Sequence, residues 1–311
     1  MDDSHFPPLV DNSKPLHLWF EEQEQYRVKV RTFSKVPPEV TIQRISFTKD
    51  VERYENAYDR GDHVCGARAR GRRELVPVHL RDQESIERSA RRAKTNLRLR
   101  VTELAPSNFC TFTTREVGPT YLGLDDWLEI WGNFIRYVRA AGSQFEYVAV
   151  LERHPSNPDH LHLHCAFRGS WHYNLLRRFW HMAIGRHMGI PIKKMMRGGD
   201  APGGVQDQPV KAARGSFKHV RKIARYISKY ITKDAITVFN RKSYFSSKGI
   251  TVKAAKAYWL ESLDYGDAIR EACKLVGEWD SVRGMTQKAF FGGERVVWFA
   301  IDPEKSPPPP F

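Results

Sequence analysis

Three alternating histidines are the first residues whose type and spacing could do chemistry. His160, His162 and His164 are separated by Leu161 and Leu163. On a β-strand, alternate side chains share one face, so the imidazoles would point one way and the leucines the other. Two imidazoles placed two residues apart can bind one divalent ion, because neutral imidazole is a common metal ligand. The alternative interpretation is a polar strand face that meets solvent.

A carboxylate precedes these histidines. Glu152 ends a strand-like segment over 145–152, and a stretch with two prolines and an asparagine separates it from the histidines. In a hairpin of the two strands, Glu152 could face the same ion, since carboxylates and imidazoles often bind a metal together. A surface carboxylate at a strand end is the alternative interpretation.

The second reactive group consists of two tyrosines, each followed three residues later by a lysine. Tyr226, Lys229, Tyr230 and Lys233 occupy positions i, i+3, i+4 and i+7, which share one stripe of a helix. A free phenol titrates near about 10 and is a poor nucleophile at neutral pH, but a nearby ammonium favours the phenolate. Tyrosines at an interface, with lysines extended beside them, are the alternative interpretation. A separate stripe would face the core: Val220, Ile223, Ala224, Ile227 and Ile231.

The elements that must position these groups follow from periodicity and from capping residues. Before the tyrosines we predict a helix over 85–104, a strand over 108–114, a helix over 127–140 capped by Asp125 and Asp126, strands over 145–152 and 160–167, and a helix over 173–187. A flexible loop over 195–209, a helix from Ser216 to Lys233, a basic turn over 244–249 and one or two helices within 254–279 follow. This order predicts an α+β fold, with a central antiparallel sheet and flanking helices.

The chain divides into three predicted regions. Residues 1–85 have scattered prolines and weak periodicity, which indicates an accessory N-terminal region. Residues 86–250 contain both reactive groups. Residues 251–311 form a helical C-terminal extension whose proline-rich tail, 306–311, is predicted to be disordered.

The charge balance predicts a polyanionic partner. Fifty lysines and arginines against 36 aspartates and glutamates give a net charge of +14. Such an excess favours nucleic acid, because each neutralised phosphate releases counterions. Solvated helix faces in a basic protein are the alternative explanation. The four scattered cysteines, the polar N-terminus and the lack of an apolar run of roughly 18 residues favour a cytoplasmic protein without a membrane partner.

A third segment, the Thr-rich stretch 109–115, completes a series that resembles the rolling-circle replication initiators of the HUH endonuclease superfamily. The order is the Thr-rich strand, then a His-hydrophobic-His motif, then the tyrosines. The segment Tyr226-Ile-Ser-Lys-Tyr-Ile-Thr-Lys233 is similar to the Tyr-x-x-Lys-Tyr-x-x-Lys signature of two-tyrosine initiators of small bacteriophages and related plasmids. The resemblance covers about residues 85–250 and implies a ferredoxin-like or RRM-like HUH nuclease core there, with the flanking regions as extensions.

The resemblance also implies roles for individual residues. Tyr226 and Tyr230 correspond to the nucleophiles, and Lys229 and Lys233 to groups that position the phosphate.

For the metal, the pair His162 and His164 is favoured because Cys-Ala-Phe follows it, which matches the apolar continuation of the family. His160 is then a third ligand or a DNA contact, and Glu152 is the candidate for an upstream acidic ligand.

The activity implied is cleavage of single-stranded origin DNA with Mg²⁺ or Mn²⁺, which leaves a 5′-phosphotyrosine and a free 3′-OH before the strand is rejoined. No G-x-x-x-x-G-K-[ST] loop occurs in the chain, so a host helicase would unwind the DNA and a host polymerase would extend it. A two-tyrosine HUH transposase and a non-catalytic basic regulator that binds nucleic acid are the alternatives. The oligomeric state does not follow from the sequence.

Overall fold

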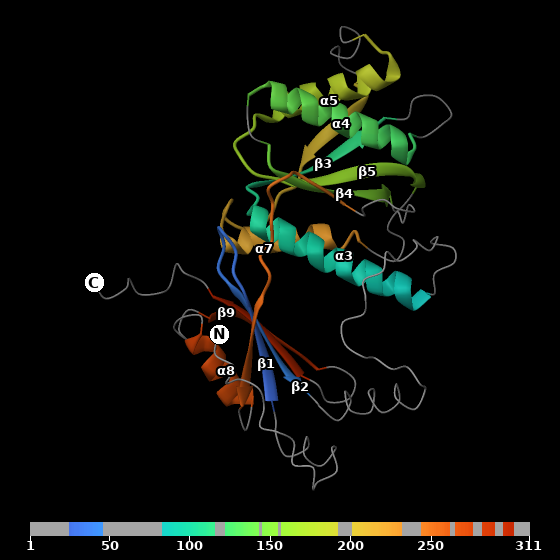
Figure 1. Ribbon diagram of the computed structural model, residues 1–311. Helices are drawn as coiled ribbons and strands as arrows, with labels where there is room; N and C mark the ends of the chain where they lie inside the picture. The colour runs from blue at the N-terminus through green and yellow to red at the C-terminus, as the bar shows by residue number, and fades with distance from the viewer. Residues whose placement is uncertain are drawn as a thin grey trace, which may run out of the picture. The chain divides into compact units, whose positions relative to one another are not determined.

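The computed structural model describes residues 25–45, 83–115, 122–142, 145–154, 157–191, 201–231, 244–261, 265–275, 282–289 and 295–301. These residues form two antiparallel five-stranded sheets with helices, which confirms the predicted α+β class (Figure 1). The chain splits into two compact units. The first unit comprises Met1–Phe33, Pro37–Glu74 and Lys253–Phe311, and the second comprises Ser34–Val36 and Leu75–Val252.

The sheet of the second unit, called the β3 sheet, contains the predicted histidine strand. Its strand order is β6-β3-β5-β4-β7, with β3 (Asn108–Thr114), β4 (Tyr147–His154), β5 (Asn157–Phe167), β6 (Gly203–Asp207) and β7 (Phe245–Ser246). Strands β4 and β5 form the predicted antiparallel hairpin, and their register sets Glu152 opposite His162. On the other side of β5, Thr111 of β3 lies opposite His164. The register therefore brings three predicted segments to one region of the sheet.

Helices cover both faces of the β3 sheet (Figure 1). On one face, α4 (Leu124–Ala140) and α5 (Tyr173–Met188) pack through Trp131 and Trp180 against Phe112 and Leu163. Leu161 and Cys165 belong to the same core, as the strand alternation predicts. The start of α4 differs from the prediction, because Gly123 is the N-cap and Asp126 accepts a hydrogen bond from its N–H at 2.8 Å.

On the opposite face, α3 (Gln83–Leu104) and α7 (Phe217–Ser228) pack against the sheet. The predicted apolar stripe of α7 is buried, with Ile223 and Ile227 in a core shared with Val148 and Val150. Ser216 caps α7 as predicted, and its side chain accepts a hydrogen bond from the backbone N–H of His219 at 3.2 Å.

Two predictions for the second unit are wrong. The loop expected over 195–209 contains strand β6, whose Gly203 lies so close to β3 that a Cβ would stand 2.2 Å from the Thr113 carbonyl oxygen. Only glycine fits there, so the strand lacks the side-chain alternation that would predict it. Likewise, the turn expected over 244–249 includes the two-residue strand β7, which pairs with β4.

The first unit contains a second sheet, called the β1 sheet. Its strand order is β8-β1-β2-β10-β9, with β1 (Gln25–Arg31), β2 (Glu39–Ile45), β8 (Lys256–Glu261), β9 (Val282–Ala289) and β10 (Arg295–Ile301). Helix α8 (Tyr265–Lys274) packs through Ala268 and Ala272 on Val28, Ile42 and Phe299. The segment 254–279 was predicted to hold helices alone, but it forms β8 as well as α8. The tail 306–311 lies outside the described residues.

Candidate metal and nucleophile site

Strands β4 and β5 bring a carboxylate and two imidazoles together on the face of the β3 sheet that α7 covers. The Oε2 atom of Glu152 is 2.8 Å from Nε2 of His162 and 2.9 Å from Nε2 of His164. These three ligand atoms lie within 4.8 Å of one another, and the described residues contain no second group of this kind. Two imidazole nitrogens and one carboxylate oxygen fit a divalent transition-metal ion or Mg²⁺.

The surroundings set the protonation of this triad. Burial acts to raise the pKa of Glu152, but the hydrogen bonds and charges of His162 and His164 outweigh burial and lower it. Burial also lowers the pKa of His164, against the opposing effect of its hydrogen bond to Glu152. An ionised carboxylate beside a neutral imidazole is the state that binds a cation.

Two further side chains hold His164 in place. The hydroxyl of Thr111 is 3.0 Å from Nδ1 of His164, and the amide of Gln208 donates to that hydroxyl at 3.0 Å. Partners of this kind fix the orientation and tautomer of a metal-binding imidazole. The Thr-rich strand therefore supports the triad from behind. Gln208 was missed by sequence reasoning, since it follows β6 and no local pattern links it to the histidines.

His160 is separate from the triad. Its Nε2 is 2.9 Å from the carbonyl oxygen of Thr114, at the end of β3. The structure therefore groups Glu152 with the favoured pair His162 and His164.

The two tyrosines lie directly against the triad. The ring of Tyr230 stacks on the His164 imidazole with centroids 4.1 Å apart and planes 7° apart. The ring of Tyr226 meets that of Tyr230 edge-on at 5.2 Å, and Phe109 packs against Tyr226 at 5.4 Å. Segments about sixty residues apart in the sequence thus form one aromatic and metal-binding cluster.

The helix that carries the tyrosines is shorter than predicted. It ends at Ser228, with Lys229 as its C-cap, and Lys233 lies outside the described residues. The chain then tightens, because the N–H of Tyr230 donates to the carbonyl of Ile227, three residues back, at 3.3 Å. This turn still brings Tyr230 next to Tyr226.

Ionisation of Tyr230 is opposed by its surroundings. Burial raises the pKa of this phenol, and the hydrogen bond to Tyr226 and the charges of Tyr226 and Glu152 raise it further. The ammonium of Lys229 lies 5.8 Å from the centroid of the Tyr226 ring, over its face. The predicted help from a lysine is therefore not what determines the pKa of Tyr230.

A basic groove opens beside Tyr226. It has a volume of about 350 Å³ and is lined by Phe109, Gln208, Pro209, Val210, Lys211, Lys222, Arg225, Tyr226 and Lys229. Tyr226 is 39% exposed, whereas Tyr230 is only partly exposed. Four cations around one exposed phenol suit a phosphate backbone.

Residues 107–235 match the model of a family of replication-associated proteins, the ORF2 type. The match covers less than half of the chain, from β3 to the turn after α7, and contains the triad and both tyrosines. It supports a replication-associated function for this region. Neither a curated protein nor a solved structure matches the chain. In the described part of the chain, no helix is both long and apolar enough to cross a membrane.

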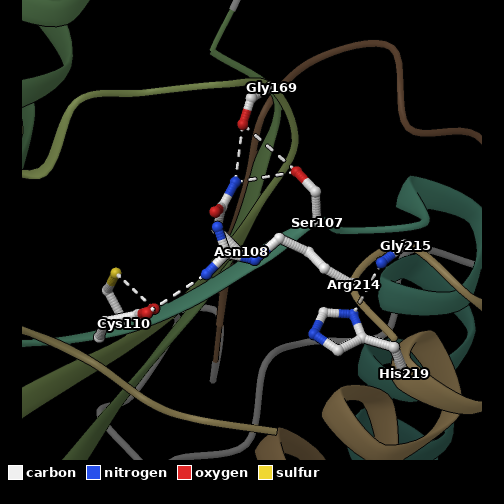
Figure 2. A network of polar contacts seen from close by, with 8 residues as sticks. Ser107, Asn108, Cys110, Gly169, Arg214, Gly215 and His219 are labelled. Carbon is white, nitrogen blue, oxygen red and sulfur yellow. Dashed lines mark hydrogen bonds and ion pairs between the residues drawn. The ribbon is translucent and has the colours of Figure 1, made fainter. Parts of the chain in front are cut away.

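A polar network anchors the replication-associated region at the start of α7 (Figure 2). The Nδ1 atom of His219 accepts a hydrogen bond from the N–H of Gly215 at 3.4 Å, and the same ring bonds to the backbone of Pro106, just before β3. The amide of Asn108 donates to the carbonyl of Gly169 at 2.7 Å, which ties the start of β3 to the end of β5. These bonds hold α7, and with it the tyrosines, over the histidine strand.

Proposed function

We propose that this protein is a two-tyrosine initiator of rolling-circle DNA replication of the HUH type, which nicks and later rejoins single-stranded origin DNA. The observation that carries the proposal is the stack of Tyr230 on His164, with Tyr226 at its edge and Glu152 bonded to both histidines. Nucleophile and metal ligands are thus within one reacting distance of each other. The match to a replication-associated family supports the same class of function.

The chemistry is a transesterification. A tyrosine hydroxyl attacks the scissile phosphorus; the new phenolic O–P bond forms while the bond from phosphorus to the 3′ oxygen breaks. The phenol proton leaves, the 3′ oxygen takes up a proton, and the products are a 5′-phosphotyrosine and a free 3′-OH. When bound by Glu152, His162 and His164, Mg²⁺ or Mn²⁺ would polarise a phosphate oxygen and offset the charge that opposes phenolate formation.

The groove supplies positioning. Lys222, Arg225 and Lys229 line it beside the exposed Tyr226, where they would hold backbone phosphates in line with the hydroxyl. Phe109 packs on the edge of Tyr226 and limits the movement of its ring. Lys233, the second lysine of the signature, is proposed for the same phosphate-positioning role.

Two adjacent phenols explain how a strand can be cut twice. While one tyrosine holds the old 5′ end, the other, whose ring centroid is 5.2 Å away, can attack the regenerated origin. The phosphotyrosine keeps the energy of the phosphodiester, so rejoining is the reverse attack by a 3′-OH and requires no ATP. A host helicase and polymerase are proposed to supply unwinding and extension.

The test is capture of the covalent intermediate. The full chain is incubated with Mn²⁺ and 5′- and 3′-labelled single-stranded oligonucleotides from replicon origins, and the products are run on a denaturing gel. We expect an adduct that retains the label of the 5′ end created by cleavage. The double variant Tyr226→Phe, Tyr230→Phe should form none, while Tyr137→Phe on α4 should behave as wild type.

Two outcomes would count against the proposal. An adduct from the double variant would show that another residue is the nucleophile. Binding of origin DNA and Mn²⁺ by the wild type without any adduct, over a panel of origins, would favour a non-catalytic regulator instead.

A further inference from the structure

One face of the β1 sheet carries cations and tryptophans rather than a core. Along β1, Tyr26, Val28 and Val30 are buried on the side of α8, so Arg27, Lys29 and Arg31 lie on the opposite face. In the described residues of the first unit, α8 is the one helix, and it packs on the other face.

The strand register adds aromatic residues to this face. Trp259 of β8 lies opposite Arg27 and is 57% exposed, the most exposed large hydrophobic side chain among the described residues. Two strands further, Trp298 of β10 lies opposite Thr41 of β2, and Thr41 lies opposite Lys29. Two tryptophans therefore flank the basic strand, about 14 Å apart across three strand spacings.

The cations are held in position and are close to one another. The guanidinium of Arg27 donates to Oε1 of Gln43 at 2.9 Å, and that of Arg31 donates to the carbonyl of Lys253 at 2.7 Å. The register also places Glu39 opposite Arg31, so the excess positive charge centres on Arg27 and Lys29. Partial burial and the neighbouring charges of Arg27 and Arg31 lower the pKa of Lys29, as expected where like charges gather.

We propose that this face binds single-stranded DNA, with phosphates at Arg27 and Lys29 and an unpaired base stacked on Trp259. A sheet face with cations between exposed aromatic residues suits a single strand, because every base offers a flat surface for stacking. Duplex DNA hides those surfaces. The face lies outside residues 107–235 and needs no cleavage chemistry, so it is independent of the function proposed above.

The test measures binding with cleavage switched off. The full chain is titrated into a fluorescein-labelled 30-nucleotide strand in EDTA, and fluorescence anisotropy is followed at several salt concentrations. We expect Lys29→Glu and Trp259→Ala each to weaken binding about tenfold, and Lys29→Glu to reduce the salt dependence as well. Trp259→Phe should restore most of the affinity, since it restores a stacking surface.

A matched control is available on the same sheet. Lys256 of β8 is exposed and lies opposite the buried Val30, so alternation places it on the α8 face. Lys256→Glu makes the same charge change and should leave the affinity within about twofold. Equal losses from Lys29→Glu and Lys256→Glu would overturn the proposal, as would unchanged binding by Trp259→Ala.

Two further readouts separate this proposal from its rivals. A strand carrying 5-iodouracil should crosslink to the peptide that contains Trp259, whereas crosslinks confined to the second unit would refute the proposal. Duplex DNA that competes as well as single-stranded DNA would also refute it. Wild type that forms no adduct but binds DNA in a Lys29-dependent way would remove the proposed function and leave this surface standing.

Discussion

The two sheets have the same number of strands and the same antiparallel pairing, yet they expose different faces. Helices cover both sides of the β3 sheet, and its histidines are nearly inaccessible, with His162 8% and His164 5% exposed. The β1 sheet has α8 on one side, and Trp259 on the edge strand is 57% exposed. A covered sheet places reactive groups by fixed contacts. An uncovered face offers a broad surface whose contacts form only with a ligand.

This difference determines how each sheet responds to mutation. At the covered site, each polar group depends on a partner, so the loss of one group leaves another buried and unsatisfied. On the open face, water replaces a lost contact, and charge contributions are graded and screened by salt. The predictions below run from the covered site outwards.

Removal of the triad should have the largest effect. Replacing His162 and His164 by alanine should weaken Mn²⁺ binding by more than about a hundredfold and abolish the adduct, because loss of an outer partner alone costs about 10- to 100-fold. Isothermal titration with Mn²⁺ measures the affinity directly. His160→Ala is the matched control, since His160 bonds to the Thr114 carbonyl and not to Glu152. Equal losses in both variants would mean that the ion is held in the other histidine register.

Loss of the support behind His164 should come next. Thr111→Val keeps the shape of the side chain but removes the hydroxyl that contacts Nδ1, so Mn²⁺ affinity should fall about 10- to 100-fold. Gln208→Ala acts one bond further away and should cost less. Thr113→Val on the same strand bonds to β6 instead, and should leave the Mn²⁺ affinity unchanged. Thermal melts of all three variants check that an altered affinity is not a folding defect.

The covered site could be predicted in large part from local pattern. Alternation alone placed His162 and His164 opposite Leu163, and the apolar stripe of α7 was predicted down to Ile227. Alternation could not choose among three histidines on one face. That choice depends on which of them lies near Glu152, and the pairing register between two strands decides it.

Contacts between distant segments were beyond the sequence. The β1 sheet joins β2 to β10, about 250 residues later, and no local periodicity encodes such a pairing. Gln208 reaches Thr111 only because β6 pairs with β3, through glycines that carry no pattern. The end of α7 at Ser228 was missed because neither glycine nor proline marks it.

The groove beside Tyr226 should show intermediate, graded effects. Arg225→Gln removes one lining cation, so affinity for a short strand that fills only the groove should fall severalfold, and the salt slope should decrease by about one. Arg139→Gln, exposed on α4 across the sheet, is the control. Lys29→Glu should not alter binding of the short strand; if it does, the two surfaces are not separate sites.

The smallest effect concerns the anchor of α7 and depends on pH. Burial lowers the pKa of His219 below its ordinary value of 6.5, against the hydrogen bond to Pro106, and Arg214 lowers it while Asp207 raises it. The folded chain therefore binds fewer protons here than the unfolded chain, so stability should be retained above pH 6.5 and lost as the pH falls below it. His219→Gln can still accept from Gly215 and does not titrate, so its melting temperature should fall less between pH 7.5 and pH 5.5, at about those values, than that of wild type. Parallel pH profiles would assign the acid sensitivity to other groups, while a profile flattened by the substitution would place it at the contact that holds the tyrosine helix on the sheet.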